Sequence, residues 1–246
     1  MSVSRRNLLA GIGSAGAGLI ISGCSIAKEP KTAAAPSLSP SKEKEKSSEV
    51  TATEDLMREH GILRRALFVY SELSSRMRRN PSAFVPDAIH KTALLFRSFG
   101  EDYHEKKLEE AFIFPVVKKI GGEASIYPDI LIAQHNRGRE ITDYILSVTE
   151  QSKPDAVNAA PMAKAMRSLV RMYRPHAARE DTIVFPAWKN SLTAKQMDEM
   201  NEKFEDIERE MFGKDGFEKA VRQISDIESE LGMADLAQFT APPITM

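Results

Sequence analysis

Apolar residues recur every three or four positions over four long stretches of the chain, which is the periodicity of amphipathic α-helices. A capping threonine or a proline marks the start of each stretch, and the predicted starts are Thr51 or Thr53, Pro86, Pro128 and Pro161. Asn80-Pro81 ends the first stretch and Gly121-Gly122 ends the second. Sustained alternation of apolar and polar residues does not occur, so strands are not expected.

Four helices with moderate connections pack most simply side by side. We therefore predict an all-α fold, an antiparallel (up-down-up-down) four-helix bundle, over residues 52–190. Further helices are predicted near 193–211 and 217–231, within a C-terminal helical extension that covers residues 191–246. The apolar face of this extension indicates that it packs against the bundle, and a partner or dimer interface is the alternative.

Residues 1–23 have the layout of an export signal. Arg5-Arg6 precede a short, glycine-rich apolar run and resemble a twin-arginine signal, while the tetrapeptide that ends at Cys24 resembles a lipoprotein lipobox. A chance arginine pair before an ordinary secretory signal is the alternative. Residues 24–51 have the composition of a flexible linker. We expect export by the twin-arginine route to the periplasmic side, with a lipid on Cys24 as the membrane anchor.

Charge and cysteine content exclude several kinds of site. The chain has 34 Lys and Arg against 35 Asp and Glu, so it lacks the basic excess of a nucleic-acid-binding protein. Its single cysteine cannot form an intramolecular disulfide or a thiolate zinc site. Any metal site must therefore use histidine and carboxylate ligands.

Each predicted bundle helix carries one histidine in its core-facing row, and these are His60, His104, His135 and His176. A single buried histidine is usually a hydrogen-bonded core residue. Four of them on separate inward faces favour a convergent metal site, because neutral imidazole is the commonest metal ligand among protein side chains. His90 lies fourteen residues before His104, roughly 21 Å along the same helix, and is excluded from that site.

Carboxylates follow two of these histidines. Glu180 lies four residues after His176, a spacing that lets both side chains reach one metal ion. Glu109 lies five residues after His104, which in a straight α-helix turns the two side chains about 140° apart. We therefore predict a π-bulge between them that restores a shared face.

The two halves of the bundle repeat this order of residues. His60 with Arg64 is matched by His135 with Arg139, and two acids with a Phe-Pro pair recur as Glu109-Glu110 with Phe114-Pro115 and Glu180-Asp181 with Phe185-Pro186. Such a repeat predicts two facing half-sites related by an approximate two-fold axis. Two half-sites suit two metal ions with bridging carboxylates, iron first, then manganese, with zinc possible.

Four residues of the repeat leave alternatives open. Glu110 and Asp181 are further candidate metal ligands, and equally they are candidate surface charges. Arg64 and Arg139 occupy equivalent positions in the repeat. Three interpretations of them stay open: ion pairs with the bridging acids, binding of an anionic ligand, or ordinary arginines on the helix surface.

Together these motifs resemble the hemerythrin-like (HHE cation-binding) domains. The resemblance covers about residues 53–190 and is carried by Glu59-His60, His104 with Glu109-Glu110 and Phe114-Pro115, Gln134-His135, and His176 with Glu180-Asp181 and Phe185-Pro186. It implies a four-helix bundle with a non-heme di-iron centre that binds O2, NO or iron. It also implies that the four histidines are terminal ligands and that Glu109 and Glu180 are bridging ligands.

One departure from the resemblance bears on function. Oxygen-carrying hemerythrins have a second histidine one turn after the third-helix ligand, and this chain has Arg139 there. A missing ligand leaves a coordination position open, which favours sensing, storage or scavenging of O2 or NO over reversible oxygen carriage. The alternatives are a di-iron oxidoreductase, such as a peroxidase or an NO-handling enzyme, and a structural or adaptor bundle. Since no nucleophile, phosphate-binding loop or dinucleotide motif occurs, the sequence favours a metal-binding protein over an enzyme. The redox partner is not encoded in it.

Overall fold

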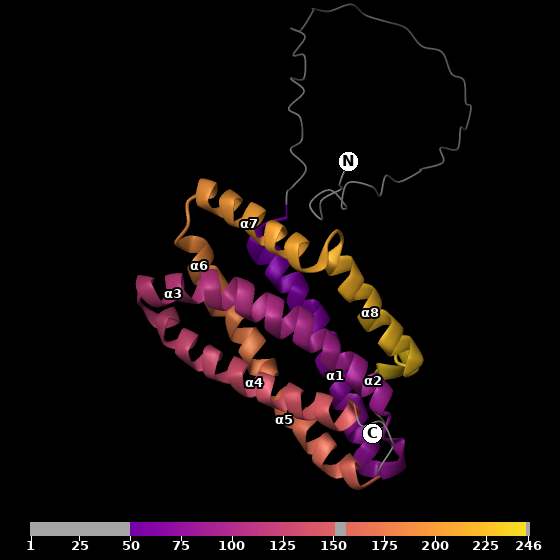
Figure 1. Cartoon of the computed structure of the whole chain (residues 1–246). Coiled ribbons are helices and arrows are strands. Elements are labelled where there is room, and N and C mark those ends of the chain that lie inside the picture. Colours follow the sequence, from indigo (N-terminus) through magenta and orange to yellow (C-terminus); the bar gives the residue numbers. More distant parts are fainter. Residues whose placement is uncertain (1–49, 151–155, 245–246) are drawn as a thin grey trace, which may run out of the picture. The chain divides into compact units, whose positions relative to one another are not determined.

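A computed structural model describes residues 50–150 and 156–244 of the chain, and Figure 1 shows that this part is helical. Those residues contain no strand, which confirms the predicted all-α class. Four helical rods form the antiparallel bundle, and they are α1 (Ala52–Arg79), α2–η3–α3 (Pro86–Leu95, Phe96–Ile113, Phe114–Ile120), α4 (Tyr127–Glu150) and α5–η5–α6 (Ala156–Arg179, Glu180–Val184, Phe185–Asn190). Around the bundle α1 contacts α5 and η3, and α4 contacts α2 and α5.

The remaining elements are short turns and the C-terminal helices. They are η2 (Pro81–Ala83), η4 (Glu123–Ile126), α7 (Ala194–Phe212), α8 (Gly216–Glu230) and η6 (Leu236–Phe239). No helix among the described residues has both the length and the apolar character that crossing a bilayer requires. Arg5, Arg6 and Cys24, on which the predicted signal and lipid anchor depend, lie outside the described residues.

The start of α1 shows how the sequence fixes a helix boundary. Of the two candidate caps, Thr51 is the one that acts: its hydroxyl accepts a hydrogen bond from the Glu54 N–H at 3.4 Å. The Glu54 carboxylate accepts one from the Thr51 N–H at 2.7 Å, which completes a capping box. The helix ends at Asn80, as predicted, because Pro81 cannot continue it.

The start of the fourth rod differs from the prediction. The helix begins at Ala156 instead of Pro161, and it runs through both Pro161 and Pro175. Ala159, before the first proline, is completely buried, as is Met162 after it. Packing on both sides of Pro161 therefore outweighs the hydrogen bond that this proline removes.

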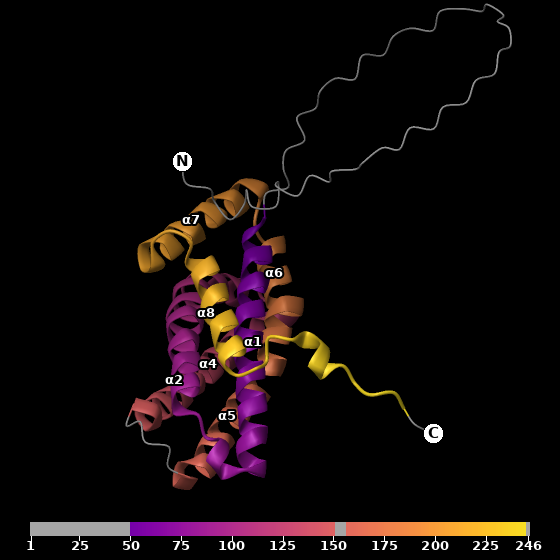
Figure 2. The same cartoon turned by 90° about the vertical axis from the view of Figure 1, so that its right-hand side faces the viewer.

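The C-terminal helices pack on the bundle, as predicted. Figure 2 shows α8 lying along α1 and α2, and contacts between these helices agree. Phe204 of α7 stacks on Trp188 at a ring distance of 5.8 Å, and Arg65 of α1 donates a hydrogen bond to Glu228 of α8 at 2.9 Å. Helices α7 and α8 thus cover one side of the bundle.

The bundle core is apolar at both ends and polar in the middle. At one end the buried side chains include Met77 and Phe96, and at the other Val184 and Trp188. Between these ends lie buried histidines and glutamates. Burying charged groups is costly unless they are paired or bind a metal, so this polar layer marks the functional site.

Gly138 in α4 fits tightly against Tyr173 in α5. A Cβ atom at residue 138 would clash with the Tyr173 hydroxyl and lie 2.9 Å from its Cε2 atom. The Tyr173 hydroxyl donates a hydrogen bond to Glu105 at 2.6 Å, which holds the ring in place. We expect Gly138→Ala to lower the free energy of unfolding by about 1–3 kcal/mol, measured by urea denaturation.

Gly61→Ala is the matched control for that substitution. A Cβ at residue 61 meets no atom within 4 Å, so alanine there is expected to stabilise the helix by up to about 1 kcal/mol. Equal effects of the two substitutions would contradict the close approach at Gly138.

Candidate metal centre

Four buried histidines, one from each rod, converge in the polar layer. They are His60 from α1, His104 from η3, His135 from α4 and His176 from α5, and none is more than 4% exposed. Glu109 and Glu180, both completely buried, lie among them. The structure thus brings together the six residues that the sequence singled out first as metal ligands.

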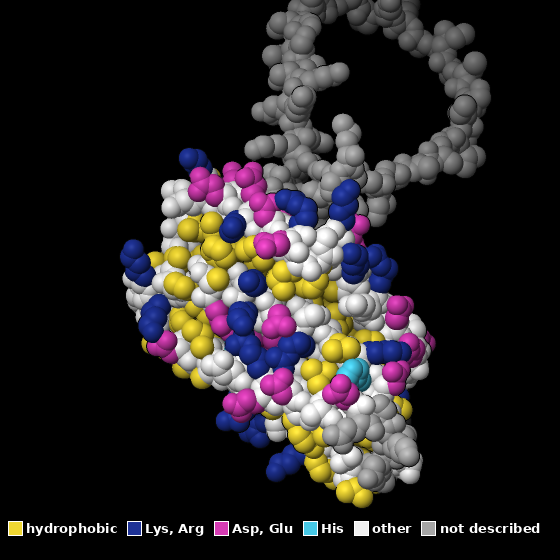
Figure 3. Space-filling view, viewed as in Figure 1, with side chains coloured by type: hydrophobic (Ala, Val, Ile, Leu, Met, Phe, Trp, Pro, Cys, Tyr) yellow, Lys and Arg dark blue, Asp and Glu magenta, His cyan; other side chains and the backbone are white. Residues whose placement is uncertain are grey.

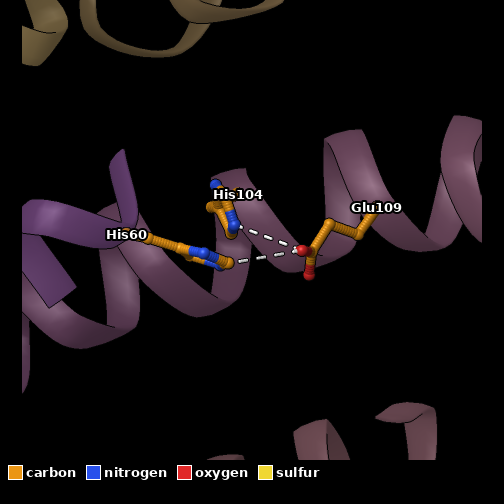
Figure 4. A group of neighbouring side chains, drawn as sticks. All are labelled: His60, His104 and Glu109. Carbon is orange, nitrogen blue, oxygen red and sulfur yellow. Dashed lines mark ion pairs between the residues drawn. The ribbon is translucent and has the colours of Figure 1, made fainter. Parts of the chain in front are cut away.

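The first half of this cluster is His60, His104 and Glu109. Figure 4 shows the two imidazoles directed at the Glu109 carboxylate. Glu109 Oε1 lies 3.2 Å from His104 Nε2 and 3.9 Å from His60 Nε2. Donor atoms of all three residues lie within 4.8 Å of one another, close enough to share one metal ion.

The second half is His135, His176 and Glu180, and it mirrors the first. Glu180 Oε1 lies 3.0 Å from His176 Nε2 and 3.9 Å from His135 Nε2. The two histidine Nε2 atoms are 3.1 Å apart. These donor atoms also lie within 4.8 Å of one another.

Each buried glutamate spans the two halves. The second oxygen of Glu109, Oε2, lies 3.4 Å from His135 Nε2. The second oxygen of Glu180, Oε2, lies 3.5 Å from His60 Nε2. One oxygen of each carboxylate therefore faces each histidine pair, the arrangement that a carboxylate bridge between two metal ions requires.

A π-helical segment places Glu109 beside His104. Residues Phe96–Ile113 form the π-helix η3, so the predicted interruption of the α-helix is confirmed and extends well beyond a single bulge. A second π-helix, Glu180–Val184, begins at the other buried acid of the cluster and was not predicted. The wider turn lets residues five apart share a face.

The outward nitrogen of every cluster histidine has a hydrogen-bond acceptor. The pairs are His60 Nδ1 with Asp181 at 2.7 Å, His104 Nδ1 with Glu59 at 2.8 Å, His135 Nδ1 with Glu110 at 2.9 Å, and His176 Nδ1 with Gln134 at 2.8 Å. When the proton is on Nδ1, Nε2 keeps a lone pair that can bind a metal ion. All four Nε2 atoms face the centre of the cluster. Glu110 and Asp181, candidate ligands in the sequence, thus lie on the outer side of the imidazoles.

The two arginines of the repeat pair with these outer acids. Arg64 forms an ion pair with Asp181, and Arg139 lies 2.6 Å from Glu110. Of the alternatives left open for these arginines, the structure shows ion pairs with carboxylates, and the partners are the outer acids instead of Glu109 and Glu180. Glu109 and Glu180 point inward and are completely buried, whereas the arginines lie toward the rim, where Arg139 reaches Glu105 as well as Glu110.

The Phe-Pro motifs hold histidines of the opposite half. Phe185 stacks on His60 at a ring distance of 5.4 Å, and Phe114 stacks on His135 at 5.6 Å. Each phenylalanine follows the buried cluster glutamate of its own rod by five residues and reaches the facing rod. The sequence repeat therefore corresponds to a structural two-fold relation.

The buried histidines and glutamates of the cluster shift one another's pKa values. Burial lowers the pKa of His135, but Glu105, Glu110 and Glu109 outweigh this and raise it to about 9. Burial raises the pKa of Glu180, but His176 and His60 outweigh this and hold it well below its usual range. Carboxylate charge at the centre thus attracts positive charge, which a metal ion can supply.

Several atoms of the cluster that could ligate a metal ion have no hydrogen-bond partner. Among the described residues, these buried atoms include His104 Nε2, both oxygens of Glu109 and both oxygens of Glu180. Leaving such atoms unpaired is costly in a folded protein. Imidazole nitrogen with carboxylate oxygen suits iron, manganese and zinc, so these residues fit a metal pair.

Several residues near the centre were not found from the sequence. Tyr173 donates to Glu105 at 2.6 Å, and Tyr103 donates to Glu59 at 3.0 Å. Tyr173 lies three residues before His176, so helical spacing on that face could have identified it. A third possible ligand group consists of Glu105, Glu110 and His135. Both glutamates of this group already accept hydrogen bonds from Arg139.

His90 is separate from the centre. Its Nδ1 lies 2.9 Å from the Thr149 hydroxyl, and it belongs to none of the possible ligand groups found among the described residues. This agrees with its exclusion on helical spacing.

Comparison with known proteins gives one family and several relatives. The Hemerythrin HHE cation binding domain matches residues 51–188. Uncharacterized proteins of Mycobacterium bovis (Mb2018) and Mycobacterium tuberculosis (MT2051 and Rv1995) are 39% identical over 240 residues, which is 97% of this chain and 91% of each relative. The similarity therefore includes the C-terminal helices as well as the bundle. No solved structure matches the chain significantly.

Proposed function

The chain belongs to the hemerythrin HHE cation-binding domain family, and on that premise we propose that its bundle holds two non-heme iron ions. The observation that carries this proposal is the division of each buried carboxylate between two histidine pairs. Glu109 lies 3.2 Å from His104 and 3.4 Å from His135, and Glu180 lies 3.0 Å from His176 and 3.5 Å from His60. Manganese and zinc suit the same donor atoms and are the next candidates.

We further propose that the iron pair binds a small diatomic ligand, O2 or NO, for sensing, storage or scavenging. A bound iron pair would supply an open coordination position for such a ligand. A small cavity beside His60, His104 and His176 has room for about one water-sized molecule, and its outer wall includes Leu63 and Leu67. A space of this size admits only a small molecule.

Residues around the histidines fix their orientation. Glu59 and Gln134 accept hydrogen bonds from His104 and His176, while Asp181 accepts one from His60. Such acceptors hold a metal-binding imidazole in one tautomer and increase its basicity. Three carboxylates and one amide serve the four histidines, so the two halves of the centre differ in charge.

A redox enzyme that consumes peroxide or NO is the second candidate function. Tyr173 favours it, because this buried phenol lines the small cavity and its ring lies 5.0 Å from the ring of His176. Its hydroxyl donates a hydrogen bond to Glu105, which holds the phenol in this position. Turnover of a defined substrate would distinguish this function from ligand binding.

Metal content and an optical spectrum test the proposal. The protein would be purified anaerobically, loaded with ferrous iron and desalted. We expect about two irons per chain and an oxo-bridge absorption that changes on adding oxygen, peroxide or NO. No stoichiometric metal after loading would contradict the proposal and leave the structural or adaptor bundle.

Export and membrane anchoring remain proposals that rest on residues 1–24 alone. Twin-arginine export suits a protein that folds around its cofactor before it crosses the membrane. The site of action would then be the periplasmic side, with Cys24 lipidated. The support is the sequence motif Arg5-Arg6 and the position of the single cysteine.

A further inference from the structure

Three cavities follow one another along the groove between α1 and α5. The outermost, about 560 Å³, lies between Ser71 of α1 and a row of α5 side chains. The middle one, about 250 Å³, has Leu67 and Ala177 in its wall. The innermost is the small cavity that reaches His60 and Glu180. The groove therefore leads from the surface to the proposed metal centre.

Shared wall residues connect these cavities. Arg174 lines both the outer and the middle cavity. Leu67, Tyr173 and Ala177 line both the middle and the inner one, together with Arg64. Helices α1 and α5 pack against each other in antiparallel directions. Wall residues one turn apart on each helix therefore follow one another along the groove, from the outer cavity to the inner one.

The outer cavity is strongly basic. Its walls include Lys164, Arg167, Arg171 and Arg174, which form one exposed stripe at three- and four-residue spacing on α5. Among the described residues none of these four side chains has an ion-pair or hydrogen-bond partner, and no acidic residue lines this cavity or the middle one. The four charges span about 15 Å along the helix.

The opposite side of the bundle is different. On the face shown in Figure 3, basic and acidic side chains are interspersed. Several of them form ion pairs, such as Arg97 with Asp143 and Lys118 with Asp129. The α5 groove differs from that face because four basic side chains without an ion-pair partner among the described residues gather around one cavity, where they raise the local concentration of anions.

We propose that the α1–α5 groove is an anion-selective entrance to the metal centre, which attracts small monovalent anions and delivers them to the inner cavity. This inference rests on the proposed metal function. The charged stripe gathers the anion, Arg174 and Arg64 line the two ends of the middle cavity, and Leu67 lies where the middle cavity meets the inner one. Because the inner cavity has room for only about one water-sized molecule and shares its wall with the middle cavity, the anion must be slender enough to enter end-on, such as azide, nitrite or hydroperoxide.

Azide association with the iron-loaded, oxidised full chain tests this entrance. Stopped-flow absorbance would compare the wild type with a triple variant, Lys164→Glu, Arg167→Glu and Arg171→Glu. We expect the association rate constant to fall by about tenfold or more at low ionic strength, and the difference to shrink at high salt. Binding of the neutral ligand NO to the reduced protein should keep its rate. These residues are exposed and contact no ligand of the centre.

A matched control changes the same charge elsewhere. The control variant Lys118→Glu, Lys119→Glu and Arg137→Glu lies on α3 and α4, and it should keep the wild-type azide rate. Leu67→Trp should slow both azide and NO, since it narrows the passage that both ligands use.

The outcomes separate the two proposals. A protein that takes up no iron contradicts the proposed metal function itself. An iron-loaded protein in which the groove variant and the control bind azide equally fast overturns the anion-selective entrance. Unchanged azide and NO rates in Leu67→Trp overturn the route.

Discussion

Glu180→Ala is expected to remove metal from both halves of the centre, while His176→Ala removes it mainly from one. Glu180 faces His176 at 3.0 Å through Oε1 and His60 at 3.5 Å through Oε2. In the proposed metal pair, loss of this carboxylate would take a ligand from each ion, together with the negative charge that both ions would share. Metal content after loading with ferrous iron should fall from about two ions per chain to well below one.

His176→Ala leaves the first half of the centre complete. His60, His104 and Glu109 keep their distances, and Glu180 still faces His60. We expect about one ion per chain to remain, which atomic absorption on the desalted protein would measure. The contrast between these two variants is the test of bridging.

Two control variants complete this experiment. Glu180→Gln keeps the volume of the side chain and removes its charge, so it separates loss of the ligand from loss of packing. Glu140→Ala removes an exposed glutamate on α4 and should bind as much metal as the wild type. Wild-type metal content in Glu180→Ala would contradict a bridging role, and total loss in His176→Ala would show that the halves do not bind independently.

Helical periodicity was enough to predict which residues meet in the centre. Histidines on the inward faces of four packed rods must approach one another, so His60, His104, His135 and His176 could be grouped without coordinates. The spacing of five residues from His104 to Glu109 even required a departure from the α-helix, and the π-helix η3 provides it.

Contacts between rods could not be predicted in the same way. The partners of the outward nitrogens, Glu59 with His104 and Gln134 with His176, belong to different helices, and their pairing depends on the rotation of each rod. The same rotation decides that Glu109 points inward and Glu110 outward. Residue spacing within one helix does not predict the hydrogen-bond partners on other helices, or the rotation that turns Glu109 inward and Glu110 outward.

Packing also overrode a local signal at the start of α5. Proline is common at the first position of helices, so Pro161 was the predicted start. The helix nevertheless begins at Ala156, because packing of the buried Ala159 stabilises the turn before the proline. Where tertiary contacts supply the stabilisation, a boundary read from a single proline fails.

Removing the metal is expected to destabilise the protein most at alkaline pH. In the metal-free protein the pKa of His135 is raised to about 9, because the neighbouring glutamates outweigh its burial. An unfolded histidine titrates near 6.5. A raised folded-state pKa contributes stability that is fully present below about pH 6.5 and is lost as the pH rises through about 9. That loss is on the order of a few kcal/mol.

The metal-loaded protein behaves in the opposite sense. Its histidines bind metal as neutral imidazoles, so protons no longer compete as the pH rises and metal binding strengthens. Glu180 stays ionised over this range, because its pKa is held well below the usual value by His176 and His60 despite burial. The difference in stability between the loaded and the metal-free protein therefore widens between pH 6.5 and 9.

Thermal unfolding with and without metal measures this difference. A metal concentration of about a thousand times the dissociation constant at pH 6.5, kept the same at every pH, adds about 4 kcal/mol at that pH, which corresponds to roughly 10 °C in Tm for a domain of this size. We expect that gap to grow with each step in pH from 6.5 to 9, and to grow less in His135→Gln, where the shifted group is absent. A gap that stays constant or narrows over this range would contradict the electrostatic account of the cluster, since protons and metal would then not compete for the same imidazoles.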